Sequence, residues 1–162
     1  MKALPIAAAA AAMMLPVAAQ AQEVGSGLYA GAQVGYHDFE GGFNSTFVGG
    51  YVGYNMPVGE TLVAGVEGNY NFGIDGDADE DTEYGASAHL GFRTGTGMVF
   101  GRIGYQEIDF DLGGLPGDDT DGGVLYGIGG EFGFGTNTAL RVTLDTISFD
   151  TTRVAAGVTF HF

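Results

Sequence analysis

The chain has 162 residues, no cysteine, 31 glycines and a formal net charge of −15 at pH 7. The lack of cysteine excludes disulfides and Cys-based metal or nucleophile chemistry, and the acidic charge excludes electrostatic binding of nucleic acid. The glycines lie within alternating apolar segments and follow no G-X-Y period, which excludes a collagen-like chain.

The first 21 residues are predicted to be a secretory signal peptide. Lys2 precedes an apolar, alanine-rich run, and the small residues Ala19 and Ala21 form the pattern of a cleavage site. The run is interrupted by two prolines and is short for a membrane span, which disfavours an N-terminal anchor. We therefore predict cleavage after Ala21, export, and a single domain formed by residues 22–162.

From residue 27 onward, apolar residues recur at every second position, which is the period of a β-strand with one apolar face. No segment keeps a helical period, because glycine interrupts nearly every window. Eight strands are predicted, at residues 27–37, 45–55, 61–72, 82–93, 97–108, 122–134, 138–149 and 151–162. They are as long as membrane-spanning strands and longer than the ~5–6 residues usual in globular sheets.

The predicted connections differ between the two ends of the strands. At one end, tight turns that contain Gly, Pro or Asn join strands two and three, four and five, and six and seven. At the other end, longer acidic connections are predicted at 38–44, 73–81 and 109–121, with only a residue or two around Asp150 between the last two strands. Exported chains with this asymmetry are typically up-and-down outer-membrane barrels, whose short turns lie in the periplasm.

One acidic connection is a candidate site for a divalent cation. Its carboxylates are spaced two residues apart: Asp75, Asp77, Asp79 and Asp81. Hard cations prefer several carboxylate oxygens, but an EF-hand requires Gly and Glu where this chain has Glu80 and Ala86. A solvated acidic loop is therefore the favoured interpretation, and a loose site that bridges to lipopolysaccharide phosphates is the alternative.

The content of the two strand faces decides between a soluble barrel and a membrane barrel. The face that includes Phe162 carries aliphatic residues, with aromatic residues toward the strand ends, as in a lipid-exposed band. The opposite face carries many glycines, scattered polar residues and all four arginines. A water-exposed surface would favour Lys, Glu and Thr, whereas a narrow lumen needs small residues beside a few long ones. We predict an all-β fold, an eight-stranded antiparallel up-and-down transmembrane β-barrel.

Charges inside such a lumen have no bulk water, so opposite charges must pair. The predicted interior ion-pair network consists of Glu67, Arg93, Arg102, Glu131, Arg141, Asp145 and Arg153. His89 and His161 also fall on the inward face, where we expect them to be hydrogen-bonding groups rather than metal ligands. No metal site beyond the acidic connection and no cofactor is predicted.

Five segments carry a resemblance to a known family: LYAGAQVGY, LVAGVEGNYNF, VFGRIGY, GIGGEFGFGTNTALRVTLD and the terminal VTFHF. The chain resembles the eight-stranded barrels of Gram-negative outer membranes, namely the outer membrane protein A barrel domain and the opacity-protein-like porin family. The resemblance implies that Glu67, Arg102, Glu131 and Arg141 belong to the interior network. It also implies that three residues form the signal for the barrel-assembly machinery: Val158, Phe160 and Phe162.

Two functions remain open for such a barrel. A structural or surface-exposed role with a plugged interior is favoured, and a narrow, cation-preferring pore for small solutes is the alternative. Outer-membrane lipid and lipopolysaccharide are the expected partners, and a monomer is the expected state. A catalytic group could be imagined from His37 near Ser45, with Asp38 or Glu40 as the acid. Nothing in the spacing of these residues requires it, so no enzymatic activity is predicted.

Overall fold

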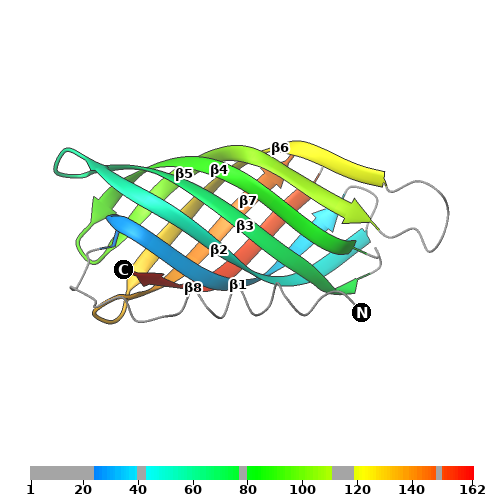
Figure 1. Cartoon of the computed structure of the whole chain (residues 1–162), viewed down its shortest axis with the longest axis horizontal. Coiled ribbons are helices and arrows are strands. Elements are labelled where there is room, and N and C mark those ends of the chain that lie inside the picture. The colour runs from blue at the N-terminus through cyan, green and yellow to red at the C-terminus, as the bar shows by residue number, and fades with distance from the viewer. Residues whose placement is uncertain (1–23, 40–42, 77–79, 111–118, 149–150) are drawn as a thin grey trace.

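The structure is a computed structural model and describes residues 24–39, 43–76, 80–110, 119–148 and 151–162 (Figure 1). Eight strands follow one another along the chain. They are β1 (Gly27–Phe39), β2 (Phe43–Val58), β3 (Leu62–Gly76), β4 (Glu80–Thr94), β5 (Gly97–Phe110), β6 (Asp119–Gly133), β7 (Thr138–Ile147) and β8 (Thr151–His161).

The sheet closes on itself. Every strand pairs antiparallel with the next, and β1 pairs with β8. The register between β1 and β8 runs from Phe39 opposite Thr151 to Tyr29 opposite His161, so the last strand is paired along its length. Closure provides backbone hydrogen-bond partners that lipid cannot provide. The predicted eight-stranded, antiparallel, up-and-down β-barrel is confirmed.

The two ends of the barrel differ, as predicted. The β2–β3, β4–β5 and β6–β7 turns and the C-terminus lie at one end, at the left of Figure 1, which we call the turn end. Gly59 and Gly95 have φ angles of +92° and +44° in the first two of these turns, a backbone conformation that other L-residues rarely adopt. The opposite end, which we call the loop end, carries the remaining connections.

The strands extend further at the loop end than the sequence predicts. The structure places β3 and β4 on most of the predicted connection 73–81, and β5 and β6 on the outer parts of 109–121. Those parts of the loop prediction are wrong, because hairpin hydrogen bonds continue past the apolar band. Acidic residues and glycines are frequent in these segments, so the alternating pattern that marks a strand is weak there. By contrast, β7 ends at Ile147, two residues earlier than predicted.

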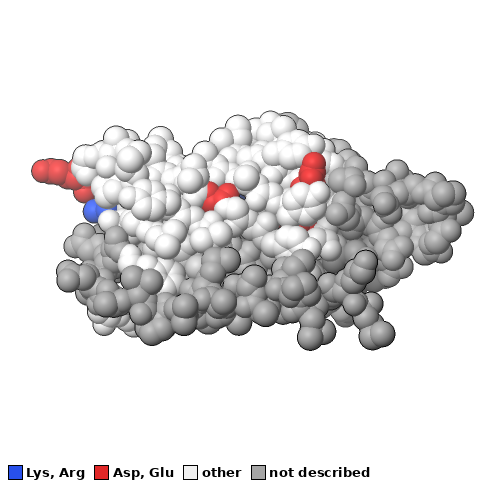
Figure 2. Space-filling model, in the orientation of Figure 1, with Lys and Arg blue, Asp and Glu red and all other residues white. Residues whose placement is uncertain are grey.

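The outside of the barrel is apolar and the inside is polar. Large exposed side chains such as Val66, Leu90 and Ile128 point away from the barrel, whereas Glu67 and Arg102 are buried inside it. Between the two ends, the described surface in Figure 2 is mostly uncharged, with one small acidic patch near its middle. This distribution is the reverse of that in a soluble protein and matches a barrel surrounded by lipid.

Two predicted features fall on residues that the structure does not describe. The signal peptide, with the cleavage site at Ala19 and Ala21, lies outside the described ranges. So do the side chains of the candidate cation site, Asp75, Asp77, Asp79 and Asp81. Within the described part of the chain, no helix is long and apolar enough to cross a membrane.

Candidate functional site: the charged interior

The centre of the lumen holds a tight group of ion pairs, which we call the central cluster: Tyr29, Glu67, Arg102, Arg141 and Asp145. Arg102 binds Asp145 in a bidentate manner, with Nε 2.7 Å from Oδ1 and Nη2 2.5 Å from Oδ2. Its Nη1 donates to Oε1 of Glu67 at 3.1 Å. The other Glu67 oxygen accepts hydrogen bonds from Arg141 and, at 2.7 Å, from the Tyr29 hydroxyl. Glu67 is therefore held by three donors from three strands.

Toward the turn end, the network continues from Arg141 to β6 and β8. Arg141 Nε lies 3.7 Å from Oε2 of Glu131, and Nε2 of His161 lies 2.5 Å from Oε1 of the same carboxylate. The Arg141 guanidinium also packs 4.7 Å from the ring centroid of Tyr51 and 4.9 Å from that of Phe100. Cation–π contacts of this kind stabilise a buried arginine.

Toward the loop end, three residues form a looser group, which we call the outer cluster: His37, Glu83 and Arg153. Arg153 lies 3.5 Å from Glu83 and 3.6 Å from Asp145, and His37 lies 3.4 Å from Glu83. The ring of Phe47 stacks on His37 with centroids 4.8 Å apart, and the Arg153 guanidinium lies 4.7 Å from the same ring. The charges here are close but are not joined by the short hydrogen bonds of the central cluster.

Together these contacts form one path along the barrel interior. It runs from His37 through Glu83, Arg153, Asp145, Arg102, Glu67, Arg141 and Glu131 to His161. His37 lies near the loop end of β1, and His161 is the last residue of β8 at the turn end. The charged groups are therefore staggered along the axis, and even the most exposed of them, Arg102, is only 8% accessible.

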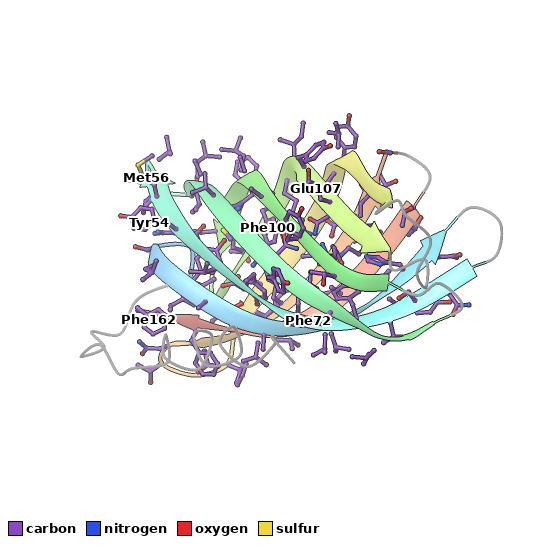
Figure 3. The ribbon with its side chains drawn as sticks, turned by 45° about the vertical axis from the view of Figure 1, so that its right-hand side comes forward. Tyr54, Met56, Phe72, Phe100, Glu107 and Phe162 are labelled. Atoms are coloured by element: carbon purple, nitrogen blue, oxygen red, sulfur yellow. The ribbon has the colours of Figure 1, made fainter. Side chains whose placement is uncertain are left out.

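Apolar clusters lie near both ends of this path. Val63, Met98 and Phe100 pack together near the turn end, where Val24 covers them. Figure 3 shows Phe100 inside the barrel, whereas Tyr54 and Met56 point outward. Nearer the loop end, buried Ile108, Leu125 and Ile147 form a second cluster. Among the described residues, buried side chains thus occupy the lumen at its centre and near both ends.

Glycine makes room for the large interior side chains. A Cβ added at Gly31 would overlap the Tyr51 ring, and one added at Gly53 would overlap the Tyr29 ring. Tyr29 can therefore reach Glu67, and Tyr51 can reach the Thr159 hydroxyl at 2.7 Å, only because the neighbouring strand carries no side chain there. Small residues beside a few long ones fill a narrow eight-stranded barrel.

The structure brings six of the seven proposed network residues into this path: Glu67, Arg102, Glu131, Arg141, Asp145 and Arg153. It places the seventh, Arg93, at the turn end of β4, where its guanidinium donates to the Gly25 carbonyl at 2.9 Å. Of the two proposed interior histidines, His161 joins the path, and His89 lies 2.6 Å from the Asn55 amide oxygen.

Three members of the interior network were not among the predicted network residues: Glu83, Tyr29 and His37, the last of which had been considered only as part of a catalytic group. The sequence pattern does indicate Glu83, because it lies two positions before Gly85 and four before Ser87, on the same inward face of β4. The signal for Tyr29 was weaker, because a tyrosine on an alternating strand fits the lipid-facing rim equally well. Its inward position follows only once the register of β1 is known.

The imagined catalytic group is only partly assembled. His37 lies opposite Ser45 in the β1–β2 register, and both are buried in the lumen. Asp38 is exposed on the outer face, and Glu40 lies outside the described residues, so the acid beside His37 is Glu83. Among the described residues, no three His, Asp or Glu side chains are grouped in a way that could hold a metal ion.

Comparison with known proteins places these features in context. A family model described as outer membrane protein beta-barrel domain matches residues 7–162. No curated protein sequence matches the chain.

Several solved structures share the fold. Ail, the attachment invasion locus protein of Yersinia pestis, is 16% identical with a TM-score of 0.62, over 87% of this chain and 100% of that one. Neisserial surface protein A is 18% identical with a TM-score of 0.55, over 85% and 98% of the two chains. The N-terminal barrel of Pseudomonas aeruginosa OprF is 16% identical with a TM-score of 0.56, over 87% and 100%. At these identities the likeness concerns the fold alone.

Proposed function

Because the chain belongs to the outer membrane protein β-barrel domain family, we propose that it is a structural, surface-exposed barrel whose interior is a salt-bridged plug. Membership in the family implies a location in the outer membrane of Gram-negative bacteria. The apolar outside of the barrel suits this location, since only a closed barrel or a helix can satisfy its backbone in lipid. The proposed role is to present the loop end at the cell surface on a rigid support, without catalysis.

The observation that carries this proposal is the continuous, buried path from His37 to His161. A solute that crossed the lumen would have to displace Arg102 from both Asp145 and Glu67. Removing one partner of a buried ion pair costs about 3–5 kcal/mol, because the other charge is left without compensation. Binding of a small hydrated ion in a lumen of this width offers little to offset that cost.

The narrow, cation-preferring pore is the second candidate. The acidic charge of the chain favours cations, and the charged groups are staggered along the axis rather than gathered at one level. A staggered arrangement would allow conduction if the side chains rearranged one after another. A pore therefore requires the charged side chains of the path to move, whereas a plug requires them to stay in place.

Conductance across a planar bilayer separates the two. The refolded protein would be compared with the double variant E67Q/R102Q and with T143V, which keeps the size of the buried Thr143 side chain and changes no charge. We expect a silent parent and a silent T143V, with current steps only after the two charges are neutralised. Conductance steps in the parent, altered in size by the double variant, would replace the plug with the pore.

We also propose the partners of the barrel from its outer surface and its last strand. Outer-membrane lipid and lipopolysaccharide would cover the apolar outside, and the barrel would be a monomer. Phe160 is exposed on that outside, and the Phe162 backbone N–H donates to the Leu28 carbonyl at 3.0 Å. With Val158, these residues would form the signal for the barrel-assembly machinery. Deletion of Phe162 should lower the amount of folded protein in the membrane, and normal levels would contradict this assignment.

A further inference from the structure

The short segment before β1 turns inward at the turn end of the barrel, where β1 begins (Figure 1). Gly25, before the strand, and Gly27, at its start, have φ angles of +85° and +76°. Two residues in the left-handed region within such a short stretch change the direction of the chain, so that residues 24–26 do not continue the line of the strand. We call residues 24–26 the strap.

The strap contacts four strands with which β1 does not pair. The Arg93 guanidinium on β4 donates a hydrogen bond of 2.9 Å to the Gly25 carbonyl. On β6, a Cβ added at Gly133 would lie 3.3 Å from a Val24 methyl group. Val24 also packs against an apolar cluster from β3 and β5: Val63, Met98 and Phe100. Because β1 pairs with β2 and β8, these contacts show that the strap crosses the mouth of the barrel.

Inward-facing side chains at the rim of this mouth are fully buried. Val63, Met98 and Ala139 are each the second residue of their strand at the turn end, and the relative exposure of each is 0%. Water would reach inward side chains this close to an open mouth. Val24 packs against the first two, and Ala139 lies opposite Gly133 in the β6–β7 register, beside Val24. The strap therefore accounts for the burial of this rim.

We infer that the strap is a lid that closes the turn end of the lumen and opens when Arg93 releases the Gly25 carbonyl. One side-chain hydrogen bond and the packing of Val24 hold it in place, whereas continuous ladders join the strands around it. The strap can therefore open locally while the barrel stays closed. Opening exposes the rim and admits small solutes to the turn end of the charged path, at His161.

This inference holds for a plug and for a pore, because it concerns entry to the lumen and not passage along it. The current steps expected of E67Q/R102Q would require the strap to open as well.

Two glycines with similar backbone angles provide a matched pair of variants. At Gly25, an added Cβ would lie 3.1 Å from a Val63 methyl group and 3.3 Å from Nε of Arg93, in a backbone conformation that L-residues rarely adopt. G25V should therefore displace the strap. Gly59, in the β2–β3 turn, has a φ of +92°, but an added Cβ there meets no atom within 4 Å. G59V therefore strains the backbone in the same way without touching the strap.

The test measures how fast a thiol at the rim reacts. The chain has no cysteine, so A139C introduces a single thiol at a buried rim position, and T136C places one in the exposed β6–β7 turn as the reference. Refolded barrels in detergent micelles are treated with a positively charged methanethiosulfonate, after folding has been checked by the heat-dependent shift in gel mobility. With the strap in place, we expect A139C to react about tenfold more slowly than T136C, because the reaction must wait for local opening.

Release of the strap should remove this protection. In the A139C background, we expect G25V to raise the reaction rate about fivefold or more, because the open form becomes more populated. R93Q shortens the side chain that holds the Gly25 carbonyl and should act in the same direction, so it replaces G25V if that variant fails to fold. G59V should leave the rate of A139C unchanged.

Three results would overturn the inference. Equal rates for A139C and T136C would show that the strap does not cover the rim. A slow rate that persists in folded G25V and R93Q barrels would show that another part of the chain protects position 139. An equal rise in G59V would show that the turn end loosens as a whole, without a specific role for the strap.

Discussion

The central cluster and the outer cluster hold buried charges in different ways. In the central cluster, Arg102 makes hydrogen bonds of 2.7, 2.5 and 3.1 Å to two carboxylates. In the outer cluster, Arg153 approaches its two carboxylates only to 3.5 and 3.6 Å. In the part of the chain that the structure describes, no guanidinium nitrogen of Arg153 and no carboxylate oxygen of Glu83 has a hydrogen-bond partner. The first group is joined by hydrogen bonds and charge, the second by charge alone.

From this difference we expect the interior to be firmer at its centre than near the loop end. Charge-assisted hydrogen bonds are directional and about twice as strong as neutral ones, so they fix side-chain positions. Charge attraction without hydrogen bonds falls off slowly with distance and tolerates rearrangement. The outer cluster lies nearer the loop end, where its charges are held together without directional hydrogen bonds. The following predictions test this contrast.

The largest effect is expected when an arginine of the central cluster is removed. R102A leaves Asp145 with Arg153 alone, which lies 3.6 Å away and makes no hydrogen bond to it. We expect this variant to lower the free energy of unfolding by about 3–5 kcal/mol. R153A leaves Asp145 bound to Arg102, so we expect less than half of that loss. Urea unfolding of both variants in lipid vesicles, followed by circular dichroism, measures the two values. Equal losses would show that the contrast in hydrogen bonding has no energetic consequence.

The next largest effect is expected for the hydroxyl that binds Glu67. Y29F removes one of three donors to this carboxylate and keeps the ring in place. Hydrogen bonds to charged groups contribute about 1.5–3 kcal/mol, and we expect a loss of stability in that range. The matched control is Y54F, because Tyr54 is 53% exposed on the outside. A loss in Y54F as large as that in Y29F would contradict a special role for the Glu67 contact.

The sequence predicts which side chains face the lumen but not which of them meet. Alternation places Glu67 and Arg102 on the inward face, because the side-chain period of a strand is two. The pairing of Glu83 on β4 with Arg153 on β8 spans the lumen and depends on the stagger of the register around the barrel. Two irregularities add to that stagger, between Thr46 and Phe47 and between Glu80 and Thr82. No local pattern in the sequence predicts them.

The contact of Arg93 at the turn end could not be predicted from the sequence either. It falls on the inward face, as predicted, but it lies at the turn end and donates to the Gly25 carbonyl. Gly25 has a φ of +85°, a conformation that directs the chain before β1 across the mouth of the barrel toward Val63 and Met98. This turn depends on contacts with β3 and β5, so the sequence around Gly25 alone does not indicate it.

A smaller effect is expected when a methyl group is added to a glycine that packs against the central cluster. The Cβ in G53A would meet the Tyr29 ring and, at 2.5 Å, the Val66 backbone oxygen, so it would displace Tyr29 from Glu67 and strain the β2–β3 pairing. Overpacking a filled interior costs about 1–3 kcal/mol, which is the loss we expect. G68A adds the same methyl group to the outside, where the nearest atom is 3.8 Å away, and should leave stability unchanged. An unchanged urea midpoint in G53A would mean that Tyr29 moves without cost, which would weaken its assignment as a donor that positions Glu67.

The smallest effect is expected in the outer cluster. E83Q keeps the shape of Glu83 and removes a charge that no hydrogen bond holds in place. Arg153 keeps Asp145 at 3.6 Å and the face of Phe47, so we expect a loss of about 1 kcal/mol or less. E67Q removes the same charge from a carboxylate that accepts three hydrogen bonds, and should cost at least twice as much. Because both substitutions are isosteric, the difference between them compares a hydrogen-bonded carboxylate with one held by charge alone. If E83Q costs as much as E67Q, charge alone holds both clusters, and the loop end of the interior is as firm as its centre.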